Sequence, residues 1–276
     1  MEAAHNDTHA GHDPHAGHAS HDPHAGHAGH DPHAGHAASA TLGLARTEDG
    51  YELGAVSAPA GVGEAGTLSF AIAGPEGEPV TEFTEEHEKK LHLIIARSDG
   101  AHFRHVHPTL DSSGTWSLPW QWDAPGSYRV FADFIPSATG AGLTLSNTIE
   151  VTGEATPEPA APHASTRTGS FDVAVSGSLA PGRGEQLRFT VSRDGEPVTS
   201  LEPYLGAFGH LVALRDGDLA YLHAHPHGDA PKPGETSGPD ITFEVNAPTP
   251  GRYLLFLDFQ VAGEVFTAPL VLDTVE

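Results

Sequence analysis

The sequence predicts an all-β fold of two tandem β-sandwich domains behind a disordered, histidine-rich N-terminal tail. Three observations predict it: apolar runs of strand length bounded by Gly, Pro, Asn and Asp, a set of motifs that occurs twice at matched spacing, and a tail dominated by His, Ala and Gly. Such runs between turn residues indicate strands, and no stretch has the period of an amphipathic helix. The expected boundaries are 1–40 for the tail, 41–153 for the first sandwich, 154–166 for a Pro- and Ala-rich linker and 167–276 for the second sandwich.

The tail carries a histidine at every third position. These candidate metal ligands are His9, His12, His15, His18, His21, His24, His27, His30, His33 and His36. The segment His-Asp-Pro-His-Ala-Gly-His begins at His12 and recurs from His21 and His30. Neutral imidazole is the commonest metal ligand among side chains, and this composition cannot build a packed core. We therefore expect several interchangeable, moderately weak metal sites. The alternative is an expression tag, although tags are usually uninterrupted His runs.

Composition narrows the function classes. The chain has 13 Lys and Arg against 37 Asp and Glu, which gives a formal net charge of -24. This charge repels nucleic acid and anionic membranes, so cations are the natural partners. The acidity can also serve solubility alone. With no cysteine and a single methionine, thiolate and thioether sites are excluded. His with Asp or Glu suits Cu(II), Zn(II), Ni(II) or Co(II). No apolar run reaches the length of a membrane helix, so we expect no direct membrane insertion by this chain.

About seven short strands are predicted in each half. In the first half the clearest are Thr67–Ala73, Leu91–Arg97, Phe103–His107, Thr115–Trp122, Tyr128–Phe134 and Thr144–Val151. In the second half they are Phe171–Val175, Gln186–Arg193, His210–Arg215, Ala220–His225, Ile241–Asn246, Tyr253–Gln260 and Val265–Leu272. This density of short strands fits a sandwich. Three tryptophans, Trp116, Trp120 and Trp122, alternate on one strand face and are expected to pack in the core or on the face of a sheet.

The two halves repeat one another. Gly77-Glu78-Pro79-Val80-Thr81 returns as Gly195-Glu196-Pro197-Val198-Thr199, and Ala132-Asp133-Phe134 returns as Leu257-Asp258-Phe259. A Pro-Gly-x-Tyr motif enters an apolar strand at Tyr128 and again at Tyr253. This motif is typical of the tyrosine corner of immunoglobulin-like sandwiches. We therefore predict two immunoglobulin-like domains that arose by duplication.

Three histidines occupy matched positions in each copy. His92 is followed thirteen residues later by His105 and then His107, and His210 is followed by His223 and His225 at the same spacing. Residues two apart on a strand face the same side, and a hairpin turn after the preceding strand would bring the earlier histidine opposite them. We predict that three imidazoles converge in each domain. The alternative is that they are structural histidines at strand ends.

Asp133 and Asp258 lie within otherwise apolar strands. A buried charge there is costly unless it meets a cation or a ring N–H, so each is a candidate fourth ligand or a residue that orients a ligand. His87, His102, His163 and His227 have no counterpart in the other copy and are interpreted as surface residues with optional metal contacts.

Several stretches carry a family resemblance. They are Leu91–Ile94, Phe103–Pro108, Tyr128–Phe134, Tyr204–Leu211 and Tyr221–Pro226. They resemble largely uncharacterised actinobacterial proteins, secreted or membrane-anchored, and the resemblance covers roughly residues 41–276. It implies an extracytoplasmic location and an association with heavy metals, copper especially. Relatives commonly have a membrane segment before the His-rich stretch, and this sequence shows neither such a segment nor a signal peptide.

These observations favour an extracytoplasmic metal-binding protein. We expect it to bind a divalent transition metal, Cu(II) first and Zn(II) or Ni(II) as alternatives, for sequestration, buffering or handover to a metal transporter or another membrane partner. The alternative is a structural or adhesive surface module whose His tail is incidental or senses pH. We do not expect an enzyme, because the sequence has no Ser or Cys nucleophile motif, phosphate-binding Gly loop or dinucleotide fingerprint. A blue-copper site would need a cysteine thiolate.

Overall fold

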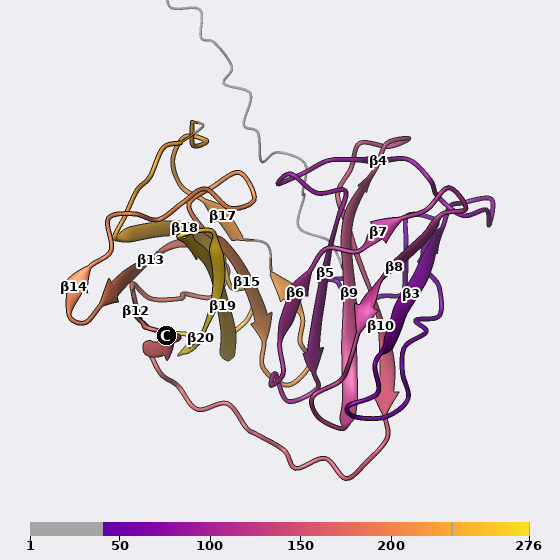
Figure 1. The fold of residues 1–276 in the computed structure, drawn as a ribbon, viewed down its shortest axis with the longest axis horizontal. Helices are drawn as coiled ribbons and strands as arrows, with labels where there is room; N and C mark the ends of the chain where they lie inside the picture. Colours follow the sequence, from indigo (N-terminus) through magenta and orange to yellow (C-terminus); the bar gives the residue numbers. More distant parts are fainter. Residues whose placement is uncertain (1–40, 223, 233, 276) are drawn as a thin grey trace, which may run out of the picture. The chain divides into compact units, whose positions relative to one another are not determined.

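The computed structural model describes residues 41–222, 224–232 and 234–275 (Figure 1). Within these residues all the regular elements are β-strands, numbered β1 to β20. None of the described segments is a helix with the length and apolar character needed to cross a membrane. The ten evenly spaced tail histidines, from His9 to His36, and His223 lie outside the described residues.

Two sheets make up the first half of the chain. One has the strand order β1-β2-β3-β8-β7, and the other has the order β10-β9-β5-β6 with β4 paired to β9. The strands are β1 (Thr47–Glu48), β2 (Tyr51–Leu53), β3 (Gly66–Ala73), β4 (Phe83–Thr84), β5 (Leu91–Arg97), β6 (Arg104–Val106), β7 (Thr109–Leu110), β8 (Thr115–Trp120), β9 (Gly126–Pro136) and β10 (Leu143–Val151).

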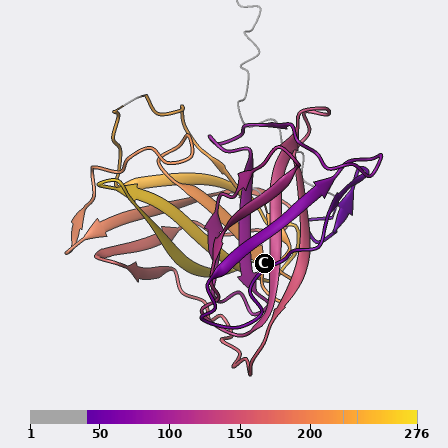
Figure 2. The same ribbon diagram turned by 45° about the vertical axis from the view of Figure 1, so that its right-hand side comes forward.

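The second half repeats this arrangement. Its sheets have the orders β11-β12-β13-β18-β17, with β14 paired to β13, and β16-β15-β19-β20. The strands are β11 (Ser165–Thr168), β12 (Phe171–Ser176), β13 (Gly184–Arg193), β14 (Glu196–Pro197), β15 (His210–Arg215), β16 (Tyr221–Leu222), β17 (Ala224–Pro226), β18 (Asp240–Asn246), β19 (Arg252–Val261) and β20 (Glu264–Asp273). Turned by 45°, the ribbon again shows the strands of each half in layers (Figure 2).

Both halves are immunoglobulin-like sandwiches. The order β2-β3-β8-β7 corresponds to β12-β13-β18-β17, and β10-β9-β5 corresponds to β20-β19-β15, which are the two sheets of the immunoglobulin fold. The Tyr128 hydroxyl donates to the Ala124 carbonyl at 2.9 Å, and the Tyr253 hydroxyl donates to the Thr249 carbonyl at 2.8 Å. These are two tyrosine corners at equivalent positions. The predicted fold class and the duplication are confirmed.

The predicted strand Ala220–His225 is not continuous. In the structure β16 pairs with β15, whereas β17 pairs with β18 in the other sheet. The chain therefore passes from one sheet of the sandwich to the other within a few residues. An extended chain keeps its two-residue alternation of side chains while it crosses from one sheet to the other. The sequence pattern alone therefore predicts one continuous strand.

Each sandwich has its own apolar core, and a third core lies between the two sandwiches. Strand β5 is buried along its whole length, because Leu91, Leu93 and Ile95 face the first core and Ile94 and Ala96 face the third. The tryptophans Trp116, Trp120 and Trp122 are buried in the first core, as predicted. The third core consists of Ile94, Ala96, Phe131, Val212, Leu214, Leu219, Tyr221, Leu254, Phe256 and Val271.

The contact between the sandwiches is reciprocal. Phe103 of the first half stacks on Phe256 of the second, with ring centroids 3.8 Å apart and planes 3° apart. Tyr221 of the second half lies against Phe131 of the first at 5.7 Å. Phe103 and Tyr221 hold matching positions in the two copies, as do Phe131 and Phe256. The same surface of each domain therefore meets its own copy, as in an isologous dimer.

We predict that Tyr128→Phe and Tyr253→Phe lower the free energy of unfolding by similar amounts, about 1 kcal/mol each. Each removes the hydroxyl that satisfies one backbone carbonyl next to a buried ring. Urea unfolding followed by circular dichroism measures the loss. If one variant matches the wild type while the other is destabilised, the two corners are not energetically equivalent.

Candidate metal centre

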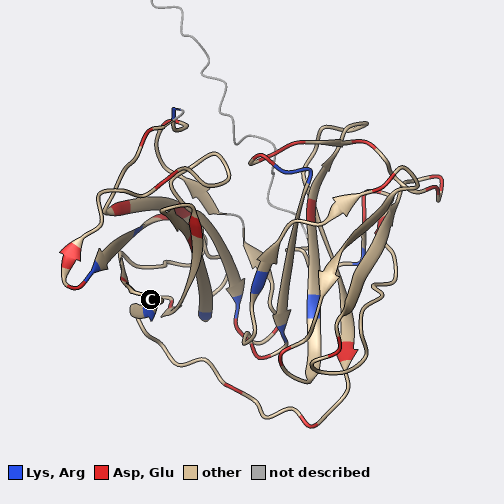
Figure 3. Cartoon of the chain, in the orientation of Figure 1, with Lys and Arg blue, Asp and Glu red and all other residues tan. Residues whose placement is uncertain are grey.

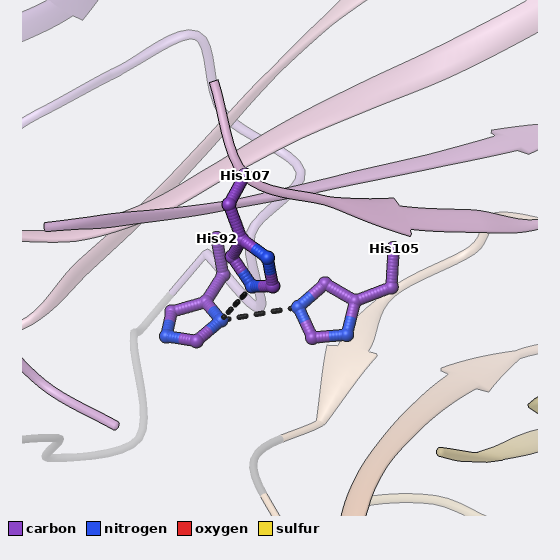
Figure 4. Close-up of side chains that lie close together, drawn as sticks. All are labelled: His92, His105 and His107. Atoms are coloured by element: carbon purple, nitrogen blue, oxygen red, sulfur yellow. Dashed lines mark hydrogen bonds between the residues drawn. The ribbon is translucent and has the colours of Figure 1, made fainter. Parts of the chain in front are cut away.

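A hairpin of the first sandwich brings three imidazoles together. Strand β5 carries His92 and pairs antiparallel with β6, with Leu93 opposite Val106 and Ile94 opposite His105. His107 follows β6 directly and points to the same side as His105 because it lies two residues further on. One ring nitrogen from each of His92, His105 and His107 lies within 4.8 Å of the others (Figure 4). The predicted convergence of this triad is confirmed.

The two distances from His92 to the other rings match those between ligands of a single metal ion. His92 Nδ1 lies 3.0 Å from His105 Nε2 and 3.2 Å from His107 Nε2. Two nitrogens bound tetrahedrally at about 2.0 Å from an ion are roughly 3.3 Å apart. The triad therefore needs only small ring movements to surround an ion, and three protein ligands leave a fourth position open.

The outward nitrogens of two rings are already occupied. His92 Nε2 donates to the Glu86 carbonyl at 3.1 Å, and His105 Nδ1 donates to the Asp258 carboxylate at 2.7 Å. These partners place the proton of each neutral ring on its outward nitrogen. When both rings are neutral, His92 Nδ1 and His105 Nε2 face each other with lone pairs, an arrangement that a cation between them would stabilise.

Burial keeps these rings neutral. Burial, followed by repulsion from His105, lowers the pKa of His92 from 6.5 to about 4. Burial, followed by repulsion from His105 and His92, lowers the pKa of His107 to about 2. Burial likewise places the pKa of His210 well below its usual value. Neutral imidazole is the form that coordinates metal, so His92 and His107 are ready for an ion at neutral pH.

The second sandwich contributes to the same cluster. The His210 ring stacks on the His92 ring at 5.3 Å with planes 3° apart, and lies 4.9 Å from the His105 ring. Asp258 pairs with His105 of the first sandwich, whereas the sequence predicts it as a partner for the histidines of its own half. The cluster therefore lies at the contact between the domains, which the spacing of residues within one copy does not reveal.

Asp133 occupies the position in the first sandwich that Asp258 occupies in the second. Each lies opposite a histidine in its sheet, Asp133 opposite His92 and Asp258 opposite His210. Asp133 accepts hydrogen bonds from the Thr144 hydroxyl at 2.8 Å and the Tyr221 hydroxyl at 3.5 Å. Its negative charge acts on His92, whose pKa it raises against the larger effect of burial.

The remaining predicted residues are distributed differently. His225 lies on β17 opposite Glu244, in the other sheet of its sandwich from His210. The predicted second triad also needs His223, so it falls outside the described residues. Within the residues that the structure describes, His92, His105 and His107 form the one group of three ligand-type side chains close enough for a single ion.

Sequence reasoning missed His87. It has no counterpart in the second copy, yet its ring lies 5.4 Å from His210 and 6.0 Å from His92. Its φ of 48° places it in a turn. The distance in sequence between a turn residue and a strand does not predict that their side chains meet, so the approach of His87 to His92 on β5 could not be predicted. By contrast, His102 lies near Glu158 and the His163 ring meets two backbone carbonyls, away from the cluster.

We predict that the metal-free protein loses stability as the pH falls from 6.5 to 4. Between these values His92 takes up a proton in the unfolded chain but not in the fold, which alone costs about 3 kcal/mol by pH 4. Urea unfolding at several pH values with a chelator present measures the loss.

The matched comparison for this loss is His107→Gln against His227→Ala. His107→Gln removes one half-buried ring with a lowered pKa and should flatten the pH dependence, whereas His227→Ala replaces an exposed histidine and is the control. Equal slopes in all three proteins would show that carboxyl groups, rather than the buried rings, cause the loss.

The profile of a family described as a domain of unknown function (DUF8832) matches residues 45–153 and again residues 165–276. No curated protein matches the chain as a relative.

Three solved structures have weak similarity to the chain. The adhesin InvE of Yersinia pseudotuberculosis is 13% identical over 81% of this chain and 58% of its own, with a TM-score of 0.25. The Escherichia coli alpha-2-macroglobulin is 14% identical over 82% of this chain and 20% of its own, with a TM-score of 0.26. Domains 4 and 5 of the S-layer protein SbsC are 11% identical over 71% of this chain and 100% of their own, with a TM-score of 0.25. The chain thus spans less than two thirds of the first two.

Proposed function

The chain belongs to this DUF8832 family, with two copies of its domain, and we propose that it binds a divalent transition metal ion at His92, His105 and His107. The observation that carries the proposal is the close approach of three ring nitrogens: His92 Nδ1 lies 3.0 Å from His105 Nε2 and 3.2 Å from His107 Nε2. Three imidazole nitrogens gathered in this way form a donor set suited to one divalent cation.

The donor set selects the kind of ion. Three imidazole nitrogens suit Cu(II), Zn(II) and Ni(II), and for nitrogen ligands Cu(II) binds most tightly of the three. The carboxylate behind His105 raises the basicity of that ligand, as in many histidine metal sites. We propose Cu(II) as the physiological ion, with Zn(II) and Ni(II) as competitors.

The tail and the triad would act together. The ten evenly spaced histidines of the tail would collect ions from solution at weak sites, and the triad would retain one ion between the domains. Acidic residues occur in both halves (Figure 3) and would raise the local cation concentration. This arrangement fits sequestration, buffering or handover outside the cytoplasm, with a metal transporter or another membrane protein as the recipient.

A structural or adhesive module is the second candidate function. The observation that favours it is the apolar third core, which would hold the two sandwiches as one rigid unit suited to displaying a surface. Several similar structures are surface proteins by title, although at TM-scores near 0.25 this likeness does not argue for either function. In this proposal the triad would be a structural cluster that binds no ion.

Metal binding by protein lacking residues 1–40 separates the two functions. We predict at least one tightly bound ion per chain after equilibrium dialysis against micromolar Cu(II), Zn(II) or Ni(II), read by elemental analysis. Replacing both His105 and His107 by Ala should weaken binding on the order of a hundredfold or more, because two of three ligands are lost. His227→Ala, which removes an exposed histidine, is the control. No bound ion in either the shortened or the full-length protein would favour the adhesive module.

The tail should compact when it binds metal. We predict that Cu(II) reduces the radius of gyration of the full-length protein in small-angle scattering, and that protein lacking residues 1–40 shows no such change. Capture by the tail should weaken as the pH falls from about 6.5 to 5, since its exposed imidazoles become protonated there. An unchanged radius with binding independently established would contradict capture by chain folding, and pH-independent affinity would indicate carboxylate ligands.

A further inference from the structure

The carboxylate that holds the triad in place comes from the second sandwich. Asp258 Oδ2 accepts the hydrogen bond from His105 Nδ1 at 2.7 Å, and the exposed fractions of these two side chains are 3% and 1%. The Thr267 hydroxyl donates to Asp258 Oδ1 across the β19–β20 ladder, where the two residues are opposite each other. The carboxylate is therefore fixed from both sides.

This bond decides what His105 offers to an ion. With its proton held on Nδ1 by a carboxylate, the ring keeps a lone pair on Nε2 and cannot turn away from His92. A ligand oriented in this way is also more basic, and loss of such an orienting group typically weakens metal affinity tenfold to a hundredfold.

The second sandwich also closes the site. His210, from β15, stacks on His92 and lies beside His105, so it covers faces of rings that the first sandwich leaves open. Asp258 and His210 are opposite each other in the β15–β19 ladder, so they reach the triad as one unit. The ligands themselves all come from β5 and the segment 104–107 of the first sandwich.

We infer that Asp258 is the positioning residue of the metal site and that a bound divalent ion acts as a clasp between the two sandwiches. The inference rests on the proposed function. Coupling between two binding equilibria is reciprocal. If docking of the second sandwich raises the affinity for the ion by some factor, binding of the ion raises the docking equilibrium constant of that sandwich by the same factor. A partner that separates the domains would therefore release the ion.

The test uses the full-length protein, buffered Zn(II) and backbone hydrogen exchange. Zinc on the tail does not protect amides of the sandwiches, so exchange there reports the triad alone. In the wild type, zinc should slow exchange in β5 and β6, which carry the ligands, and also in β19, which carries none. Protection of β19 is the signature of the clasp.

Asp258→Asn keeps the size and one acceptor oxygen but removes the charge. We expect the zinc concentration at half protection of β5 to rise tenfold to a hundredfold and the zinc-dependent protection of β19 to disappear at saturation. The nitrogen chemical shifts of the His105 ring should move from the Nδ1–H form towards the Nε2–H form. Asp273→Asn, which removes a half-exposed carboxylate paired with Arg252, is the matched control and should leave all three measurements unchanged.

Thr267→Val tests the same chain of contacts if Asp258→Asn does not fold. It removes one hydroxyl behind the carboxylate and should raise the half-protection concentration about twofold to tenfold, the worth of one hydrogen bond. An unchanged midpoint in the folded variants, or protection that stops at β5 and β6 in the wild type, would overturn the clasp and leave the proposed function standing. If zinc protects no strand of the wild type, the proposed function itself fails.

Discussion

Burial of the second apolar face of four strands is the constraint on which the structure depends. Strands β5, β9, β15 and β19 each have one face in the core of their own sandwich and another that would meet water in an isolated domain. Side chains such as Ile94, Phe131 and Leu214 are fully buried only because the two sandwiches meet there. The hydrophobic effect makes this contact the natural state of the pair.

The histidine cluster lies where this apolar contact gives way to polar residues. On β5 and β15 the outward position two residues before Ile94 and Val212 is a histidine, and each faces an aspartate on the neighbouring strand. Polar groups buried at such a place need partners within the protein. The hydrogen bonds of Asp258, Asp133 and His92 supply many of them. One ring nitrogen each of His92, His105 and His107 lies close to the other two, so the same residues serve packing and the proposed ion binding.

Much of this could be predicted from the sequence, and the limits have a physical cause. Strands β5 and β15 begin and end at the predicted residues because an unbroken apolar run bounded by turns has few other interpretations. The triad followed from a thirteen-residue spacing across a hairpin. The pairing of Asp258 with His105 did not follow, because an apolar run indicates burial on both faces without identifying the surface that covers the second face. His87 was missed because its place depends on a turn that has no repeat elsewhere in the chain.

The reciprocal contact of Phe103 with Phe256 and of Tyr221 with Phe131 has an evolutionary consequence. A surface that binds its own copy is what a one-domain ancestor needs to form a symmetric homodimer. In such a dimer every substitution appears on both sides at once. Fusion of two copies into one chain removes that restriction, so each half can change alone. Phe103 and Tyr221 already differ by a hydroxyl group. The hydroxyl of Tyr221, in the second half, donates a hydrogen bond to Asp133 of the first half.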